Sequence, residues 1–116
     1  MTATLKLKGR ELAKGLRFPE GPIAMADGSV LLVEIERGSL SRVDQNGRVE
    51  VVAQTCGGPN GAAIGPDGKC YLCNNGGFRW HHEAGGYMRP VGRADDYSGG
   101  RIECVDLSTG RTEVLY

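Results

Sequence analysis

An internal repeat with an offset of 40 residues constrains the fold of this 116-residue chain more than any other feature. Pro-Glu-Gly at 19–21 aligns with Pro-Asn-Gly at 59–61, and without a gap the Asp-Gly pair at 27–28 then aligns with the pair at 67–68. A short apolar run follows each pair. Because self-similarity at a fixed period of this size is typical of repeat architectures, we expect two copies of one structural unit.

The two copies differ in length after the shared apolar run. Residues 38–44 align with residues 100–106 at an offset of 62, so the second copy has 22 additional residues, which we place in an inserted loop at 76–99. Asp-Gly and Asn-Gly pairs predict tight turns, because glycine adopts positive φ at no steric cost. The expected strands lie near 22–26, 30–35, 39–44 and 48–54 in the first copy, and near 62–65, 69–74, 101–106 and 111–116 in the second.

Four antiparallel strands in roughly 40–45 residues form the blade of a β-propeller, so the predicted fold class is all-β, a β-propeller fragment. Residues 19–54 would form one blade, residues 59–116 a second, and residues 4–16 an outer strand that precedes both. Because propellers have about 4–8 blades, two blades cannot close a ring. We therefore expect a fragment of a longer protein, or self-association through exposed blade faces. The alternative is a self-contained β-sandwich, which does not require the repeat.

Composition narrows the possible partners and the cellular compartment. The 14 basic and 14 acidic side chains cancel, which argues against nucleic acid or an anionic membrane as a partner. The first ten residues contain no apolar stretch of the kind found in secretory signals, so we expect a cytoplasmic protein. Glycine accounts for 19 residues, which indicates many turns between short strands.

The four cysteines include a Cys-x-x-Cys pair, Cys70 and Cys73. Such a pair is half of a zinc site or a redox motif, but no second pair accompanies it. The repeat aligns these positions with Val30 and Val33. We therefore interpret both cysteines as small buried apolar residues.

Two equivalent polar residues, Glu20 and Asn60, stand where the first strand of each copy begins. The first strand of a blade lines the central channel, so both oxygens would approach the propeller axis, and such oxygens suit a hard divalent cation. A turn-forming Asn and a Glu at a strand end explain the same residues without a ligand. Asn75, just before the inserted loop, and His81 and His82 within it lie on the same face, and we assign them to substrate contact. The two histidines are not assigned as metal ligands, because the loop has no HExxH spacing.

Four motifs, at 18–22, 58–61, 65–71 and 96–102, resemble the gluconolactonase and regucalcin (senescence marker protein) family of LRE-like propellers. The resemblance implies six blades in about 300 residues and one divalent cation, Ca²⁺ or Zn²⁺, in the channel. It implies that Glu20 is a metal ligand and that Asn60 contacts substrate or metal-bound water. The remaining ligands, an Asn and an Asp that is also the general base, would lie beyond Tyr116. Animal members carry an Arg where this chain has Gly58.

The expected function is hydrolysis of a lactone or a related sugar-acid ester by metal-activated water. No catalytic residue is assigned within the chain, and we expect the 116 residues alone to be inactive. Three alternatives remain: a propeller enzyme of the strictosidine-synthase or paraoxonase type, a non-catalytic binding propeller, and a truncated product.

Overall fold

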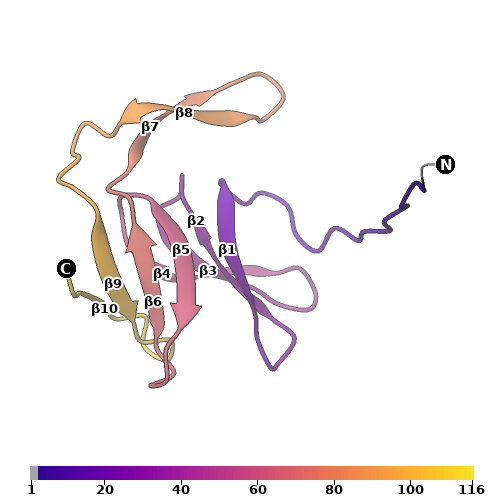
Figure 1. Cartoon of the computed structure of the whole chain (residues 1–116), viewed down its shortest axis with the longest axis horizontal. Coiled ribbons are helices and arrows are strands. Elements are labelled where there is room, and N and C mark those ends of the chain that lie inside the picture. Colours follow the sequence, from indigo (N-terminus) through magenta and orange to yellow (C-terminus); the bar gives the residue numbers. More distant parts are fainter. Residues whose placement is uncertain (1–2) are drawn as a thin grey trace.

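The computed structural model describes residues 3–116, which form ten strands and no helix (Figure 1). None of these residues therefore belongs to a helix able to cross a membrane. The strands are β1 (Pro19–Ala24), β2 (Val30–Glu34), β3 (Ser39–Val43), β4 (Val49–Gln54), β5 (Pro59–Ile64), β6 (Cys70–Asn74), β7 (Phe78–His82), β8 (Met88–Arg93), β9 (Arg101–Val105) and β10 (Thr112–Val114).

The two four-stranded antiparallel sheets predicted from the repeat are present, and the all-β propeller-fragment fold is confirmed. Blade 1 has the order β1-β2-β3-β4, and blade 2 has the equivalent order β5-β6-β9-β10. The inner strands begin at Pro19 and Pro59, three residues before their predicted starts. A register shift lies near the start of each inner strand, between Glu20 and Ile23 in β1 and between Pro59 and Gly61 in β5. This irregularity is why alternation in the sequence places the strand starts too late.

The Asp-Gly turns repeat in their hydrogen bonding. The carboxylate of Asp27 accepts a bond from the Ser29 amide at 2.9 Å, and Asp67 accepts one from the Lys69 amide at 3.0 Å. The Ser29 hydroxyl also donates to Asp27, and these bonds hold the pKa of that carboxyl below its ordinary value. The side chain of each aspartate thus closes the turn that the following glycine permits.

The core lies between the two blades. Val33, Leu40 and Ala53 are cross-strand neighbours on one face of blade 1. They pack against a matching set on blade 2, formed by Cys70, Leu72 and Val105. Each of these six residues is at most 6% exposed, and apolar burial of this kind is the main force that holds the two blades together.

The interpretation of both cysteines as buried residues is half wrong. Cys70 is fully buried in the core, and burial together with the nearby Cys104 raises the pKa of its thiol to about 11. Cys73 is exposed. Positions three apart in a strand point to opposite faces, and only the face that carries Cys70 meets blade 1.

The structure assigns no strand to residues 4–16, for which the sequence predicts an outer strand. A strand exists only through its ladder, and no described strand pairs with this segment. The C-terminal part of this segment nevertheless approaches blade 1 at the position where β4 approaches blade 2. A Cβ on Gly47 would lie 2.2 Å from the Leu12 carbonyl oxygen, and a Cβ on Gly110 would lie 2.5 Å from that of Val52. Leu12 and Val52 are 40 residues apart, so the segment follows the repeat in position.

The insertion is a β-hairpin rather than the predicted loop. Strands β7 and β8 pair antiparallel and form a separate two-stranded sheet. In Figure 1 this hairpin lies at the end of the molecule where the inner strands β1 and β5 begin. The insertion therefore adds structure to the face on which the sequence places function.

Candidate functional site

The starts of the inner strands bring the two predicted site residues onto neighbouring positions. Glu20 in β1 and Asn60 in β5 are both exposed. A Cβ on Gly21 would lie 3.2 Å from the Ala62 amide nitrogen and 3.4 Å from the Gly61 Cα, so the two backbones nearly touch one residue further on. The backbones that carry these two exposed residues therefore run close together at equivalent positions of the two blades.

The packing around Gly58, the residue before Pro59, explains why this chain has no arginine at that position. A Cβ on Gly58 would lie 2.3 Å from the Asn75 side-chain oxygen, so the Asn75 carboxamide occupies the space of a side chain. The same oxygen accepts a hydrogen bond from the Gly77 amide at 2.8 Å. Asn75 therefore supports both the approach to Asn60 and the entry into the hairpin.

A buried carboxylate, Glu34, lies behind the start of β1. It accepts hydrogen bonds from the Arg17 amide at 2.8 Å and from the Arg37 guanidinium at 2.8 Å. The hydroxyls of Ser39 and Ser41 also donate to it. Burial is the largest influence on the pKa of Glu34 and opposes ionisation, but the four donors together hold that pKa below its ordinary value.

Blade 2 builds the corresponding group from different positions. The repeat places Asn74 at the position of Glu34, and the carboxylate comes instead from Glu103 on β9. The Glu103 carboxylate accepts bonds from the Arg101 guanidinium at 2.8 Å and from the Asn74 amide at 3.1 Å. Each blade therefore contains one buried carboxylate that is paired with one arginine.

Both arginines also bind the chain that enters the inner strand. Arg37 donates to the Gly15 carbonyl at 3.1 Å, and Arg101 donates to the Thr55 carbonyl at 2.8 Å. Gly15 and Thr55 are themselves 40 residues apart, five residues before Glu20 and Asn60 respectively. We call each arginine–carboxylate pair an entry clamp, because it fixes the segment that leads to a candidate site residue. Sequence alignment misses these clamps, because their charged residues come from non-equivalent positions.

The hairpin packs over the start of blade 1 through aromatic and charged contacts. The rings of Phe18 and Trp80 have centroids 5.0 Å apart, and Phe78 contacts Trp80 edge to face at 5.9 Å. The His82 Nε2 lies 3.1 Å from a Glu36 carboxylate oxygen that also accepts a bond from Arg17. Both predicted substrate-binding histidines are exposed on β7, and His82 thus connects the hairpin to blade 1 through an exposed contact.

Trp80→Ala is expected to release this hairpin from blade 1. Loss of the aromatic pairs should cost about 1–2 kcal/mol locally, which corresponds to roughly tenfold faster amide hydrogen exchange over residues 78–93. Exchange monitored by mass spectrometry measures this. Tyr87→Ala at the exposed hairpin tip is the control and should leave the rates unchanged. Equal exchange in both variants would show that Trp80 does not hold the hairpin.

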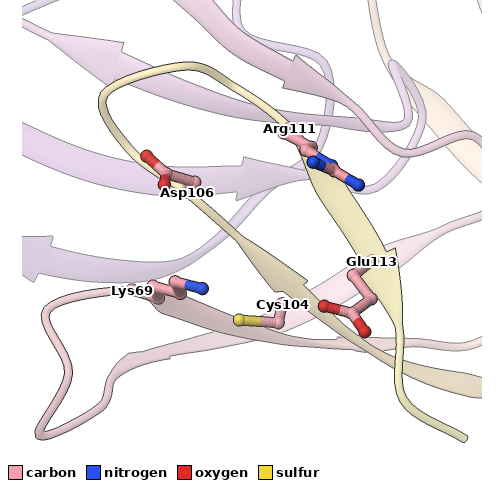
Figure 2. A pocket seen from close by; sticks show the side chains of 5 residues that line it. All are labelled: Lys69, Cys104, Asp106, Arg111 and Glu113. Carbon is pink, nitrogen blue, oxygen red and sulfur yellow. The ribbon is translucent and has the colours of Figure 1, made fainter.

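A pocket of about 240 Å³ lies at the opposite end of blade 2, lined by Lys69, Cys104, Asp106, Arg111 and Glu113 (Figure 2). Its mixed charges suggest a site, but an equivalent pocket of about 200 Å³ occurs in blade 1. That pocket is lined by Arg42, Asp44, Arg48 and Glu50, which the repeat aligns with four of the same positions. A hollow that recurs once per blade follows from the shape of the blade, so we do not assign chemistry to it.

Comparison with known families decides the relationship. The sequence profile described as the SMP-30/Gluconolactonase/LRE-like region matches residues 18–115. The chain belongs to the SMP-30/gluconolactonase/LRE-like family. This confirms the resemblance seen in the sequence, and members of the family generally bind a divalent metal ion. No match was found among curated proteins.

We next ask whether the residues of this chain fit the divalent metal ion that members of the SMP-30/gluconolactonase/LRE-like family generally bind. Within residues 3–116, no group of three or more His, Cys, Asp or Glu side chains is close enough to hold an ion. The inner-strand starts do present the oxygen ligands that hard cations prefer, a Glu20 carboxylate and an Asn60 amide. These two donors fit a divalent cation in kind.

Proposed function

We propose that this chain contributes the first part of the active site of a metal-dependent lactone hydrolase. The observation that supports the proposal is the close backbone approach of β1 and β5 at Gly21, one residue after Glu20 in β1 and next to Gly61, which follows Asn60 in β5. The substrate class we propose is a small lactone or a related sugar-acid ester. A divalent cation bound there, Ca²⁺ or Zn²⁺, would supply Lewis-acid chemistry at the ester carbonyl.

The residues of this chain have distinct proposed roles. Glu20 is the metal ligand, since it supplies the anionic oxygen at the inner edge. Asn60 offers both a donor and an acceptor, which suits positioning of a substrate oxygen or a water molecule. The entry clamps of Arg37 and Arg101 are positioning elements, because they hold the segments that lead to these two residues.

The hairpin would form one wall of the substrate pocket. Its aromatic contact with Phe18 lies two residues before Glu20, so the wall stands beside the proposed ligand. Asn75 and Gly77 fix the base of the hairpin next to Gly58. Exclusion of water and selection of the ring substituents are the tasks that a wall of this kind performs in hydrolases.

Titration with Ca²⁺ and Zn²⁺, followed by NMR of the backbone amides, tests the proposed site. We expect shifts centred on Gly21 and Gly61, and Glu20→Gln should weaken cation binding at least about tenfold because it removes the anionic oxygen. Glu113→Gln, which changes an exposed carboxylate in the pocket of Figure 2, is the matched control and should bind as the parent chain does.

Hydrolysis of a panel of lactones by the same proteins provides the second measurement. The 116-residue chain supplies Glu20 and Asn60 but no assigned general base, so we expect turnover near the uncatalysed rate. Unchanged cation affinity in Glu20→Gln, or shifts centred on the Glu113 pocket, would refute the metal assignment. Rapid hydrolysis that survives Glu20→Gln would refute the proposed chemistry.

A further inference from the structure

Phe18, two residues before Glu20, has a strained backbone. Its φ is +60°, in the left-handed region that bulky side chains rarely adopt. The next residue is Pro19, and a proline pushes the residue before it towards extended conformations. Strain of this kind persists only where surrounding contacts enforce it, and it is concentrated near functional sites. The conformation of Phe18 therefore requires a contact that holds it.

The backbone hydrogen bonding of the blade does not by itself require this conformation. The Phe18 carbonyl accepts a bond from the Ile35 amide at 3.0 Å, and the equivalent bond in blade 2 joins the Gly58 carbonyl to the Asn75 amide at 2.8 Å. Gly58 makes its bond with a φ outside the left-handed region, although a glycine there would tolerate either conformation. What distinguishes Phe18 from its equivalent in blade 2 is therefore its side chain.

That side chain packs on the hairpin. The Phe18 ring lies 5.0 Å from the Trp80 ring, centroid to centroid, with the two planes tilted by 53°. A second connection runs through Glu36, whose amide donates to the Arg17 carbonyl at 3.2 Å and whose carboxylate contacts His82. Among the described strands, β7 and β8 pair only with each other. These side-chain contacts, rather than a shared sheet, therefore dock the hairpin on blade 1.

We propose that the docked hairpin holds Phe18 in its left-handed conformation and thereby sets the position of Glu20. Phe18 and Trp80 are then positioning residues for the cation site, and this inference rests on the proposed function, in which Glu20 is the metal ligand. Only Pro19 separates Phe18 from Glu20, and because the proline ring fixes φ, a backbone change at Phe18 is passed on to Glu20. By linkage, a cation bound at Glu20 must favour the docked hairpin as much as the hairpin favours cation binding.

NMR of the metal-free protein tests this coupling. Trp80→Ala should move Phe18 out of the left-handed region, which its one-bond Cα–Hα coupling reports, and should change the Cα shifts of Glu20 and Gly21. Trp80→Phe keeps an aromatic ring and should behave as the parent chain does. Tyr87→Ala at the exposed hairpin tip is the control. A left-handed Phe18 in Trp80→Ala, or unchanged Cα shifts at Glu20 and Gly21, would overturn the proposal.

Phe18→Gly tests whether the Phe18 ring transmits the effect. Glycine adopts positive φ without strain but has no ring to contact the hairpin. In this background, Trp80→Ala should therefore cause no further change in the Cα shifts of Glu20 and Gly21. Changes as large as those in the parent background would show that the hairpin acts by another route, and Phe18 would lose its assigned role.

Cation binding gives a second readout. Trp80 is the only tryptophan in the chain, so acrylamide quenching of its fluorescence reports docking of the hairpin. Ca²⁺ or Zn²⁺ should reduce this quenching, and Trp80→Ala should weaken cation binding about fivefold or more, whereas Trp80→Phe should not. Equal cation affinity in the parent chain and Trp80→Ala would overturn the positioning role. A parent chain that binds neither cation would refute the metal assignment of Glu20, and the metal-free measurements would still decide whether the hairpin holds Phe18.

Discussion

Glu34→Ala is expected to lower the free energy of unfolding by about 3 kcal/mol, because it leaves buried donors without their acceptor. Ser39 and Ser41 are fully buried and donate to this carboxylate, as do the Arg17 amide and Arg37. Arg37 is partly exposed, so water recovers some of the loss at that donor. Urea denaturation followed by circular dichroism measures the effect.

Two variants bracket this result. Glu34→Gln retains an acceptor oxygen and should cost only about 1 kcal/mol. Glu113→Ala removes an exposed carboxylate and should change stability by less than about 0.5 kcal/mol. If Glu34→Ala destabilises no more than Glu113→Ala, the entry clamp does not stabilise blade 1.

The pH dependence of stability gives an independent readout of the same group. The pKa of Glu34 is lower in the folded chain than its ordinary value. Its ionisation therefore stabilises the fold above the ordinary carboxyl pKa, and this contribution is lost as the pH falls through the lowered value. Glu34→Gln cannot titrate, so its stability should fall less steeply in that acidic range. If the stability of both proteins fell equally steeply with decreasing pH, Glu34 would not be the group responsible.

Gly110→Ala should cost about 3 kcal/mol of unfolding free energy. Gly110 has a φ of +75°, and an added Cβ would lie 2.5 Å from the Val52 carbonyl oxygen in β4. The substitution thus combines backbone strain with a clash against a strand that is paired within its own sheet. Thermal and urea unfolding of the variant check the value.

Substitutions at two other glycines separate the effect of backbone strain from the effect of the steric clash. Gly68 has a similar φ of +78° but open space around it, so Gly68→Ala should cost only about 1 kcal/mol from strain. Gly47→Ala would bring the Cβ to 2.2 Å from the Leu12 carbonyl, but residues 3–16 form no strand and can move aside. We expect the order Gly110, Gly47, Gly68 in decreasing cost. Equal costs at all three would mean that the contact with Val52 is unimportant.

Local signals explain what the sequence predicted correctly. The Asp-Gly pairs and apolar runs act within a few residues, so they locate turns and strands, and the 40-residue offset relates the two sheets. The placement of Glu20 and Asn60 at neighbouring strand starts followed from the same offset. The side of a strand that meets a neighbour is a property of packing, and for this reason Cys73 was assigned to the wrong environment.

The features that the sequence did not reveal depend on contacts between distant residues. The insertion forms a hairpin whose position is set by Trp80 against Phe18, 62 residues away along the chain. The entry clamps use an arginine at 37 in one blade and at 101 in the other, which no gapless alignment matches. Residues 4–16 have a strand-like pattern, but without a partner ladder they form none.

The different origin of the two buried carboxylates has a consequence for how the chain folds. Similar tandem sheets can exchange strands while folding, for example when β2 pairs with β9 in place of β3. Such an exchange would put Glu34 and Glu103 into one sheet and leave the other sheet with Asn74 and the serines of β3. Two carboxylates would then be crowded into one dry interior, a costly arrangement. Only the native pairing gives each sheet a single buried carboxylate beside its own arginine, so the placement of these two acids disfavours exchange of strands between the blades.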